Sequence, residues 1–398
     1  MTLPLDGLKV LDMASLAAGP LAATYLGEFG ADVVKLEPPG VGDAIRGWGA
    51  QRDGVGVMWK SVSRNKRSVT VDLRVPDGQD LARRLAASCD VVVANTRPAT
   101  LRRWGLDHER LRAGNERLVM LHVTGFGLEG PKAEFPGFGT VGEAMSGFAH
   151  LTGEADGPPT LPAFMLADGV ASLTAAYAVM MALYERDARG GTGHGRLVDV
   201  NLVDPLARLI EQSLLTWDAT GTVPTRKGNR WDISAPRNTY RTADDRWIAM
   251  SGSAPTVALR VFRAIGRADL AEDPDFADPQ RRLARAGEVD AVVADWVARH
   301  SLDEAMAVFE AAEIAAGPVY TVADLVADEQ MVAREVFRRV DDAELGSLLV
   351  QGPVPRMPGL APRVDHLGPP LGAHTDEVLA EIGIDDATRA DLRGRGVI

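Results

Sequence analysis

The chain of 398 residues contains a single cysteine, few aromatic residues and no long uninterrupted apolar run. Cys89 therefore has no partner for an internal disulfide, and no cluster of Cys and His residues has the spacing of a structural zinc site. No window approaches the roughly 18 consecutive apolar residues of a membrane span, and the N-terminal segment lacks the basic and apolar regions of a secretory signal. We therefore expect a cytoplasmic protein without membrane spans, in which Cys89 is a small buried hydrophobic residue.

Positive charge is also scarce, because 43 Lys and Arg residues face 55 Asp and Glu residues, which gives a net charge of -12. Non-specific nucleic-acid binding depends on a positive surface that releases counterions, so we expect no nucleic-acid partner. An anionic ligand would need a local basic pocket. Hydrophobic residues make up 46% of the chain and charged residues 25%, which is typical of a globular protein with a substantial core, and the length favours about two domains.

Several catalytic signatures are missing as well. The chain has no G-x-S-x-G, P-loop, H-E-x-x-H or Cys-based nucleophile motif. The first turn after the opening strand, residues 14–20, lacks the glycine pattern that binds the pyrophosphate of a dinucleotide. Any chemistry must therefore use a carboxylate or a single histidine.

What is present is an alternation of strands and helices. The spacing predicts strands over 8–13, 32–36, 68–73, 90–94 and 118–123, and helices over 20–29, 77–88, 167–189 and 203–220. Strands that are apolar throughout, alternating with helices, indicate an α/β fold with a mostly parallel sheet. The polar stretch 221–235 is typical of a linker. A smaller unit follows, with a strand at 246–250, helices at 254–265 and 286–299, and a capping box that starts at Ser301.

Basic residues gather near the end of the predicted strand 90–94. Asn95 and Arg97 follow that strand directly, at the edge where open α/β sheets bind ligands. The other basic residues that could join them in a phosphate-binding cluster are Arg46, Arg64, Lys66, Arg67, Arg102 and Arg103. The alternative is a solvated basic edge, and the residues alone do not decide between the two.

Two further features could carry chemistry. Glycine-rich segments at 124–131 and 136–139 permit close approach of the backbone to a ligand. Asp168 lies within an apolar run where a long helix begins. On the residues alone, the favoured role of Asp168 is to cap that helix.

Taken in order, many segments resemble one family, the class III coenzyme A transferases, which includes formyl-CoA and carnitine-CoA transferases and the related α-methylacyl-CoA racemases. The resemblance covers almost the whole chain. It is carried by Pro4–Asp12, Ala18–Pro20, Gly30–Glu37, Gly42-Asp43, Asn65–Ser68, Asn95–Pro98, Arg103, Gly125–Gly127, Asp168, Thr192–Gly195, Gly317–Val319 and His374–Leu379.

This resemblance implies a Rossmann-like large domain built from residues 1–220 and 331–398, a smaller domain at 236–330 and an interlocked homodimer. It implies that Asp168 is the nucleophile and that no metal or tightly bound cofactor takes part. The substrates would be an acyl-CoA and a carboxylic acid. The positions that match the coenzyme A site are Ala17, Ala18, Asn95, Thr96, Arg97, Arg103 and Phe138.

The implied chemistry is an exchange of acyl groups on Asp168. Its carboxylate attacks a thioester to form a mixed anhydride, the released thiolate then forms an aspartyl-CoA thioester, and an acceptor acid repeats the exchange. Backbone amides of Gly169 or of the loop 137–139 are the expected donors to the oxyanions.

Racemisation of a 2-methylacyl-CoA is the alternative reaction, and it needs two proton-transfer groups on opposite faces of the α-carbon. The His-Asp pair of the racemases is replaced here by Phe138 and Gly139, which favours transfer. Glu143, Asp156 or His150 could substitute as the base. A CoA-binding protein without turnover is a third possibility. The residues that depart from the formyl-CoA transferase pattern, which argue against formyl or oxalyl substrates, are Ala17, Pro38 and Pro136.

Overall fold

The computed structural model describes residues 2–398, which form two compact units. Unit 1 comprises the residues up to Phe148, Leu161–Thr222 and Ala333–Ile398, and unit 2 comprises Ala149–Thr160 and Val223–Val332. The segment 149–160 thus lies outside the large domain to which the sequence assigned it. Hydrogen bonds attach it to unit 2, because Arg226 Nη1 donates to the His150 carbonyl at 2.9 Å and the Gly228 amide donates to the Gly153 carbonyl at 2.9 Å.

Unit 1 is built around a six-stranded sheet in which every neighbouring pair of strands is parallel. The strand order is β5-β2-β1-β6-β7-β8. The strands are β1 (Lys9–Asp12), β2 (Asp32–Glu37), β5 (Lys66–Thr70), β6 (Val91–Ala94), β7 (Val119–Thr124) and β8 (Leu197–Asn201). The predicted α/β class with a mostly parallel sheet is confirmed.

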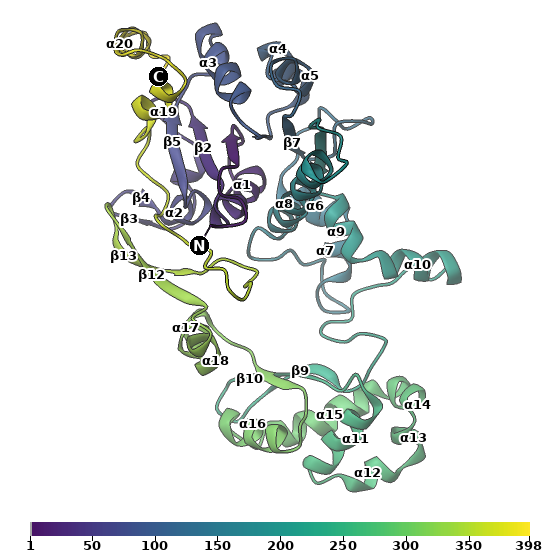
Figure 1. Cartoon of the computed structure of the whole chain (residues 1–398). Helices are drawn as coiled ribbons and strands as arrows, with labels where there is room; N and C mark the ends of the chain where they lie inside the picture. Colours follow the sequence, from purple (N-terminus) through teal and green to yellow (C-terminus); the bar gives the residue numbers. More distant parts are fainter. Residues whose placement is uncertain (1) are drawn as a thin grey trace. The chain divides into compact units, whose positions relative to one another are not determined.

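Helices cover both faces of this sheet. On one face α1 (Ala18–Glu28) and α8 (Leu166–Asp187) pack against each other and on the strands, around Val10, Val93 and Leu121. On the other face the core contains side chains of α3 (Pro76–Ala87), α4 (Pro98–Trp104), α5 (His108–Gly114), α19 (Thr375–Glu381) and α20 (Asp386–Gly394). Figure 1 shows α19, near the end of the chain, beside the N-terminal strands, where it contacts β5.

Helix α8 is long and apolar enough to cross a membrane by length and composition. One side of it, which includes Ala171, Ala175 and Val179, is fully buried in the unit 1 core, and the core helix of a globular unit passes the same test. The other side is exposed and carries large apolar residues. These are Leu173, Tyr177, Met180, Met181 and Tyr184.

One predicted element is wrong, and one element was missed. The single helix expected over 203–220 is divided into α9 (Asp204–Leu209) and α10 (Glu211–Thr220), because the Ile210 amide bonds to the Ala207 carbonyl at 3.2 Å and tightens the turn there. The sequence also missed the hairpin of β12 (Phe337–Asp342) and β13 (Gly346–Gln351). Its turn has recognisable chemistry, since Asp342 Oδ1 accepts two backbone amides and Gly346 has a φ of 69°.

The other short elements complete the two units. Before Leu161 they are η1 (Ala44–Gly47), β3 (Gln51–Arg52), β4 (Val55–Gly56), α2 (Val57–Val62), α6 (Gly139–Met145) and α7 (Phe148–Leu151). Unit 2 has an antiparallel sheet in the order β11-β10-β9, formed by β9 (Arg237–Arg241), β10 (Trp247–Ser251) and β11 (Ala316–Pro318). Its helices are α11 (Pro255–Ala264), α12 (Ala268–Glu272), α13 (Pro274–Ala277), α14 (Pro279–Ala284), α15 (Ala286–Val297), α16 (Leu302–Ala311) and α17 (Val322–Ala327), with α18 (Glu329–Ala333) at its boundary.

Two local predictions are confirmed. The capping box at the start of α16 is present, because the Ser301 hydroxyl accepts from the Glu304 amide while Glu304 accepts from the Ser301 amide. Cys89 is buried, and burial raises the pKa of its thiol to about 12. The cysteine therefore stays a neutral thiol inside the core.

Candidate active site

The carboxyl ends of β1 and β6 lie side by side, because these strands are neighbours at the centre of the sheet. From β1 the chain continues to β2 on one side, while β6 and β7 lie on the other side, so the strand order reverses here. Open α/β sheets bind their ligands at such a point. The side chain of Asn95, just after β6, joins the two loops: it donates to the Ser15 carbonyl at 2.7 Å and accepts from the Ser15 amide at 2.9 Å.

Asp168 lies at the same place, in the first turn of α8. Its partly buried carboxylate lies near the Ala18 amide and its own amide, which act to lower its pKa. The Ser172 hydroxyl joins the two helix starts, because it bonds to the Ala18 carbonyl at 2.8 Å and to the Asp168 carbonyl at 2.5 Å. Since Ala18 is the first residue of α1, the N-termini of two helices, whose dipoles favour negative charge, converge on this carboxylate. Asp168 is not the cap that its sequence position suggested, because the N-cap of α8 is Met165 and has no side-chain cap bond.

Two neighbours restrict the Asp168 carboxylate further. A Cβ atom at Gly139, the first residue of α6, would lie 2.4 Å from Asp168 Oδ2, so only glycine leaves room for the carboxylate. Glu143, on the same helix, is buried, and its Oε1 accepts from the Ala167 amide at 3.3 Å. Burial and the nearby Glu143 carboxylate raise the pKa of Asp168 above its usual range, and the two amides offset this only in part. The site thus holds a poorly hydrated, basic carboxylate, as a nucleophile requires.

The predicted oxyanion donors are partly wrong. The Gly169 amide donates to the Met165 carbonyl at 2.9 Å within the helix, so it is not free for an oxyanion. The glycine-rich segments approach each other closely, because a Cβ at Gly137 would lie 2.6 Å from Gly125 Cα. This backbone-to-backbone packing explains Gly125 and Gly137. The backbone donor that lies near Asp168 from another element is Ala18, and nothing in its residue type indicated that role.

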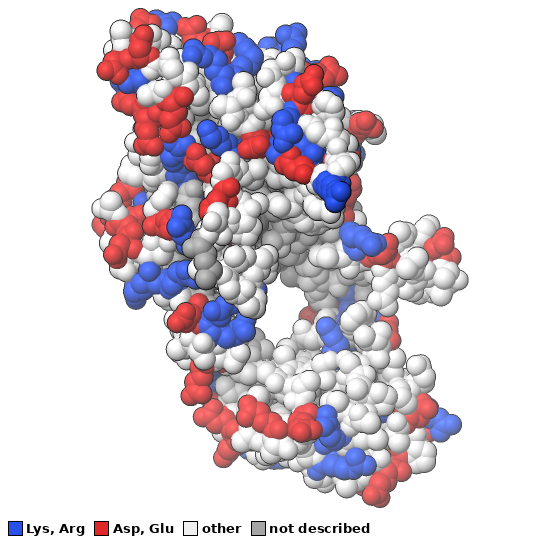
Figure 2. All heavy atoms as spheres, in the orientation of Figure 1, with Lys and Arg blue, Asp and Glu red and all other residues white. Residues whose placement is uncertain are grey.

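The predicted phosphate-binding cluster does not form as expected, because four of its cations are already bound to carboxylates. Arg46 pairs with Glu37, Arg64 with Glu28, Lys66 with Asp12, and Arg67 with Asp32 and Glu381. They are not a solvated basic edge either, since each is buried or largely buried in these pairs. Figure 2 agrees, because basic and acidic side chains are interspersed over the face of unit 1 that it shows.

Arg97 and Arg103 remain as candidates. Arg97 is the N-cap of α4 and Arg103 lies in its last turn; both are exposed, and neither forms an ion pair within residues 2–398. Their neighbour Arg102 pairs with Glu134 at 2.9 Å. Thr96 presents its carbonyl to His122 Nε2 at 2.7 Å. Phe138 is 58% exposed.

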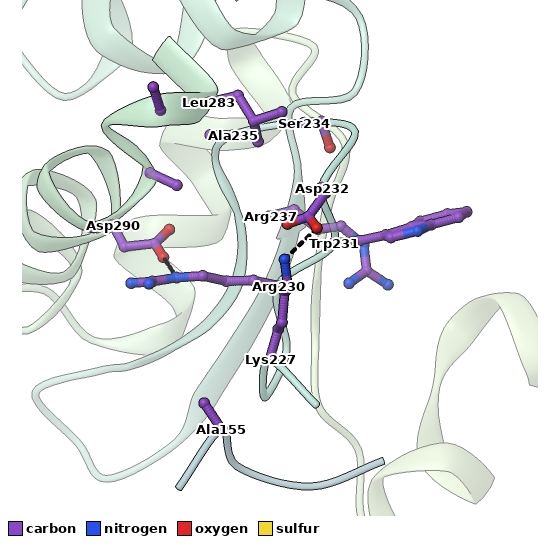
Figure 3. A pocket seen from close by; sticks show the side chains of 13 residues that line it. Ala155, Lys227, Arg230, Trp231, Asp232, Ser234, Ala235, Arg237, Leu283 and Asp290 are labelled. Atoms are coloured by element: carbon purple, nitrogen blue, oxygen red, sulfur yellow. Dashed lines mark hydrogen bonds and ion pairs between the residues drawn. The ribbon is translucent and has the colours of Figure 1, made fainter. Parts of the chain in front are cut away.

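Unit 2 has a pocket of its own, with a volume of about 330 Å³, which the sequence did not predict (Figure 3). Two of the cations that line it are neutralised, since Arg230 Nε lies 2.6 Å from Asp290 and Lys227 pairs with Asp232. Asp290 also accepts from Asn238 at 2.9 Å and from the Tyr240 hydroxyl at 2.8 Å. A carboxylate with this many donors organises unit 2 and has little capacity left for a ligand.

The fold and the site together define an α/β enzyme whose candidate reacting group is a carboxylate at the reversal point of a parallel sheet. The chain belongs to CoA-transferase family III, whose family model matches residues 5–375, and it is an enzyme of that family.

Relatives and solved structures agree with this assignment. The chain is 37% identical to a Succinyl-CoA--D-citramalate CoA-transferase of Chloroflexus aurantiacus, over 99% of this chain and 98% of that protein. It is also 37% identical to the beta subunit of a Succinyl-CoA--L-malate CoA-transferase of the same organism, over 100% of this chain and 98% of that protein. A crystal structure of a CAIB/BAIF family protein from Brucella suis matches with a TM-score of 0.84 and 32% identity, covering 96% of this chain and 100% of that one.

Proposed function

We propose that this enzyme transfers coenzyme A from an acyl-CoA to a carboxylic acid, with Asp168 as the covalent nucleophile. The observation that carries the proposal is the place of Asp168: a partly buried carboxylate in the first turn of α8, joined to the start of α1 through Ser172 and packed against Gly139, where a Cβ would lie 2.4 Å from its Oδ2. A poorly hydrated carboxylate attacks a thioester more readily than a hydrated one, because it has less water to lose.

The reaction proceeds by four acyl exchanges. An oxygen of Asp168 attacks the thioester carbonyl, the C–S bond breaks, and a mixed anhydride and CoA thiolate result. The thiolate attacks the aspartyl carbonyl, which releases the donor acid as a carboxylate and leaves an aspartyl-CoA thioester. The acceptor carboxylate attacks this thioester to give a second anhydride, and the thiolate then takes the new acyl group and frees Asp168. The Ala18 amide stabilises the negative charge that develops on the aspartyl oxygen.

We further propose short dicarboxylic acids as the substrates. The two relatives above are named for succinyl-CoA as the donor and for citramalate or malate as the acceptor. The coenzyme A moiety lies along Ala17, Ala18, Asn95, Thr96 and Phe138, and its phosphates pair with Arg97 and Arg103, two exposed guanidiniums that form no ion pair within residues 2–398.

The decisive experiment combines an activity screen with covalent trapping. Succinyl-CoA is incubated with a panel of dicarboxylic acids, and mass spectrometry detects any new thioester. Hydroxylamine added during turnover converts an aspartyl thioester into an aspartyl hydroxamate, which peptide mapping should place on Asp168 and which Asp168→Asn should lack. Turnover with an unmodified Asp168 peptide would exclude covalent catalysis by this residue.

One observation keeps racemisation as a second candidate. Glu143 is a buried carboxylate close enough to Asp168 to raise its pKa, and racemisation needs two proton-transfer groups. A 2-methylacyl-CoA incubated with the enzyme in deuterium oxide distinguishes the two reactions. We expect no deuterium at the α-carbon, and rapid incorporation would establish a racemase.

We also propose that two copies of the chain form an interlocked homodimer. Two helices of unit 1 support this assembly: α8 has a large exposed apolar side, and α10 buries no residue. On α10, Leu214 and Leu215 are each 60% exposed and Trp217 is 49% exposed. Figure 1 shows α10 extending from the rest of unit 1, and Figure 2 shows that its surface is largely uncharged. An apolar surface of this kind is typical of one that a partner covers.

A further inference from the structure

The three residues that follow Met13, at the end of β1, are held by side chains from other parts of unit 1. The Ala14 amide donates to Asp12 Oδ1 at 3.0 Å, and the Ala14 carbonyl accepts from Lys35 Nζ. The Ser15 amide and carbonyl are both bonded to the Asn95 side chain. The Leu16 amide donates to Asp43 Oδ1 at 3.0 Å. Each of the three residues 14–16 thus has at least one backbone group that is hydrogen-bonded to a side chain.

Leu16 has a backbone conformation that leucine rarely adopts. Its φ is 66°, in the left-handed region, where a residue with a Cβ is sterically disfavoured. Such a conformation persists only where surrounding contacts over-determine it. The turn at Leu16 leads directly into α1, whose first residue, Ala18, brings an amide donor beside Asp168, since the Ser172 hydroxyl bonds to the carbonyls of both residues, at 2.8 and 2.5 Å. The position of that donor therefore depends on the segment 14–16.

The side chains that hold this segment include four buried charges. Lys35 Nζ lies 3.0 Å from Asp43 Oδ2 and 4.0 Å from Asp12 Oδ1, and Lys66 Nζ lies 2.9 Å from Asp12 Oδ2. All four side chains are at most 1% exposed. Lys66 also donates to the Pro20 carbonyl at 2.7 Å, which fixes the first turn of α1. Although burial acts to raise the pKa of Asp43, Lys35 and the Ile45 and Leu16 amides lower it below its usual range.

A buried ion network of this kind is poorly explained by stability. Replacing a buried ion pair by apolar residues of similar volume is often neutral or stabilising, because the cost of desolvation cancels the Coulomb attraction. What such a network does provide is precise positioning, because its charged atoms hydrogen-bond to particular backbone groups and hold them in place. Here the groups it sets are the Ala14 carbonyl, the Leu16 amide and the Pro20 carbonyl, on both sides of Ala18.

We propose that Lys35 and Asp43 are positioning residues for the transfer reaction, which hold the segment 14–16 so that the Ala18 amide stays on the Asp168 carboxylate. This inference rests on the proposed function. Neither residue touches the reacting atoms, so both act through the backbone. Loss of the network should lower kcat, because the amide no longer stabilises charge on Asp168, and should leave binding of the acyl-CoA nearly unchanged.

The test compares two buried lysines. Lys35→Met removes the positioning cation, and Lys60→Met is the matched control, because Lys60 is 3% exposed and pairs with Asp342 at 2.8 Å and Glu344 at 2.7 Å, away from this segment. In Lys35→Met we expect kcat to fall about 10- to 100-fold, as for a small displacement of a catalytic group, with KM for the acyl-CoA within about threefold. Lys60→Met should keep kcat within about twofold.

Hydrogen exchange gives a second readout that does not need turnover. The peptide covering residues 13–18 should exchange faster in Lys35→Met and at the wild-type rate in Lys60→Met. Equal kcat in the two variants, or unchanged exchange in Lys35→Met, would overturn the proposal. If the wild-type enzyme transfers no acid of the panel, the proposed function fails, and the exchange result still decides whether Lys35 holds the segment.

A third variant covers the case in which Lys35→Met does not fold. Asn95 is partly exposed, so Asn95→Ala removes both bonds to Ser15 with little risk to folding. We expect lower kcat and faster exchange of residues 13–18. A rise in KM with unchanged kcat and exchange would mean that Asn95 contacts coenzyme A without holding this segment, and it would contradict the positioning role.

Discussion

At the scale of single residues, the site holds a carboxylate in surroundings that destabilise its ionised form. Asp168 is partly buried, lies near a second carboxylate and has a raised pKa, so the folded protein holds its ionised form less well than water does. The proposed function explains this arrangement, because the same environment that disfavours the ion would make it a better nucleophile. Stability and activity therefore make opposite demands on Asp168.

Asp168→Asn should abolish transfer and stabilise the fold. Activity should fall about 10³-fold or more, as for removal of a covalent nucleophile. The folded pKa of Asp168 is raised above the unfolded value of 3.8, so the stability tied to its protonated form is complete below 3.8 and is lost as the pH rises through the folded pKa. The asparagine variant escapes that loss and should have the higher Tm at pH 7.

Thermal denaturation at several pH values checks this expectation. The difference in Tm should shrink as the pH falls toward 3.8, where the aspartate becomes protonated in both states. Asp341→Asn, which removes an exposed carboxylate of β12, is the control and should leave Tm nearly unchanged. A lower Tm for Asp168→Asn at pH 7 would mean that the carboxylate stabilises the fold.

Arg97 and Arg103 give a prediction about binding. Replacing either by Ala should raise KM for the acyl-CoA by the equivalent of about 1–3 kcal/mol, the usual contribution of a charged hydrogen bond, and should leave kcat nearly constant. Arg102→Ala is the matched control, because Arg102 lies between them on α4 but pairs with Glu134. Steady-state kinetics with succinyl-CoA measure all three variants. Equal KM values for the three would remove Arg97 and Arg103 from the coenzyme A site.

The sequence indicated which residues mark the site but not how they are used. Asp168 and Asn95 were both singled out, and both lie at the central edge of the sheet. The roles of Arg46, Arg64 and Lys66 were wrong, because each of them pairs with a carboxylate that lies 9 to 54 residues away in the sequence. No local pattern encodes such a pair, since it depends on which strands become neighbours.

At the scale of elements, the N-termini of three helices come together at the candidate site. The first turns of α1 and α8 supply the Ala18 amide and Asp168, and α6 begins at Gly139 against the same carboxylate. Helices α1 and α8 could be predicted, from the alternation of apolar strands with helices and from the apolar spacing over 167–189, whereas α6 was missed. The contact between these helix starts could not be predicted. Helices α6 and α8 approach each other through small residues, and a small residue does not reveal in the sequence that a larger side chain would displace its neighbour.

Gly139→Ala tests this packing. The added Cβ would lie 2.4 Å from Asp168 Oδ2, so the carboxylate must move away from the Ala18 amide. We expect kcat to fall at least about tenfold, which corresponds to about 1.4 kcal/mol of transition-state stabilisation. Gly394→Ala, at the end of α20, is the control, because its Cβ would meet no atom within 4 Å. Full activity of Gly139→Ala would show that the carboxylate does not need this position.

At the scale of the whole molecule, unit 1 has more apolar surface than its own elements cover. The apolar spacing predicted helix at both α8 and α10, although it joined α10 to α9, and it did not indicate what covers the exposed residues of these helices. Binary patterning identifies a buried face but does not identify the chain that buries it. A second copy is the occupant that the family resemblance implies.

A homodimer predicts twice the chain mass of 42.5 kDa in sedimentation, and the α10 surface can be tested directly. The double variant Leu214→Asp/Leu215→Asp places two charges on the exposed apolar side of α10 and should shift the protein to the monomer mass. Gln212→Glu adds one charge to the same helix without removing an apolar side chain, and it should remain dimeric.

An interlocked dimer can be distinguished experimentally from a dimer whose subunits meet only at their surfaces. Two chains threaded through each other cannot separate unless at least one of them unfolds, whereas dimers that meet only at surfaces exchange subunits by dissociation. Tagged and untagged wild-type dimers, purified separately and mixed under native conditions, should therefore give no mixed dimers on affinity capture. The same mixture, unfolded and refolded together, should give them. Mixed dimers that appear without unfolding would show that the copies associate through their surfaces alone, with the α8 and α10 faces as the interface and no threading of the chains.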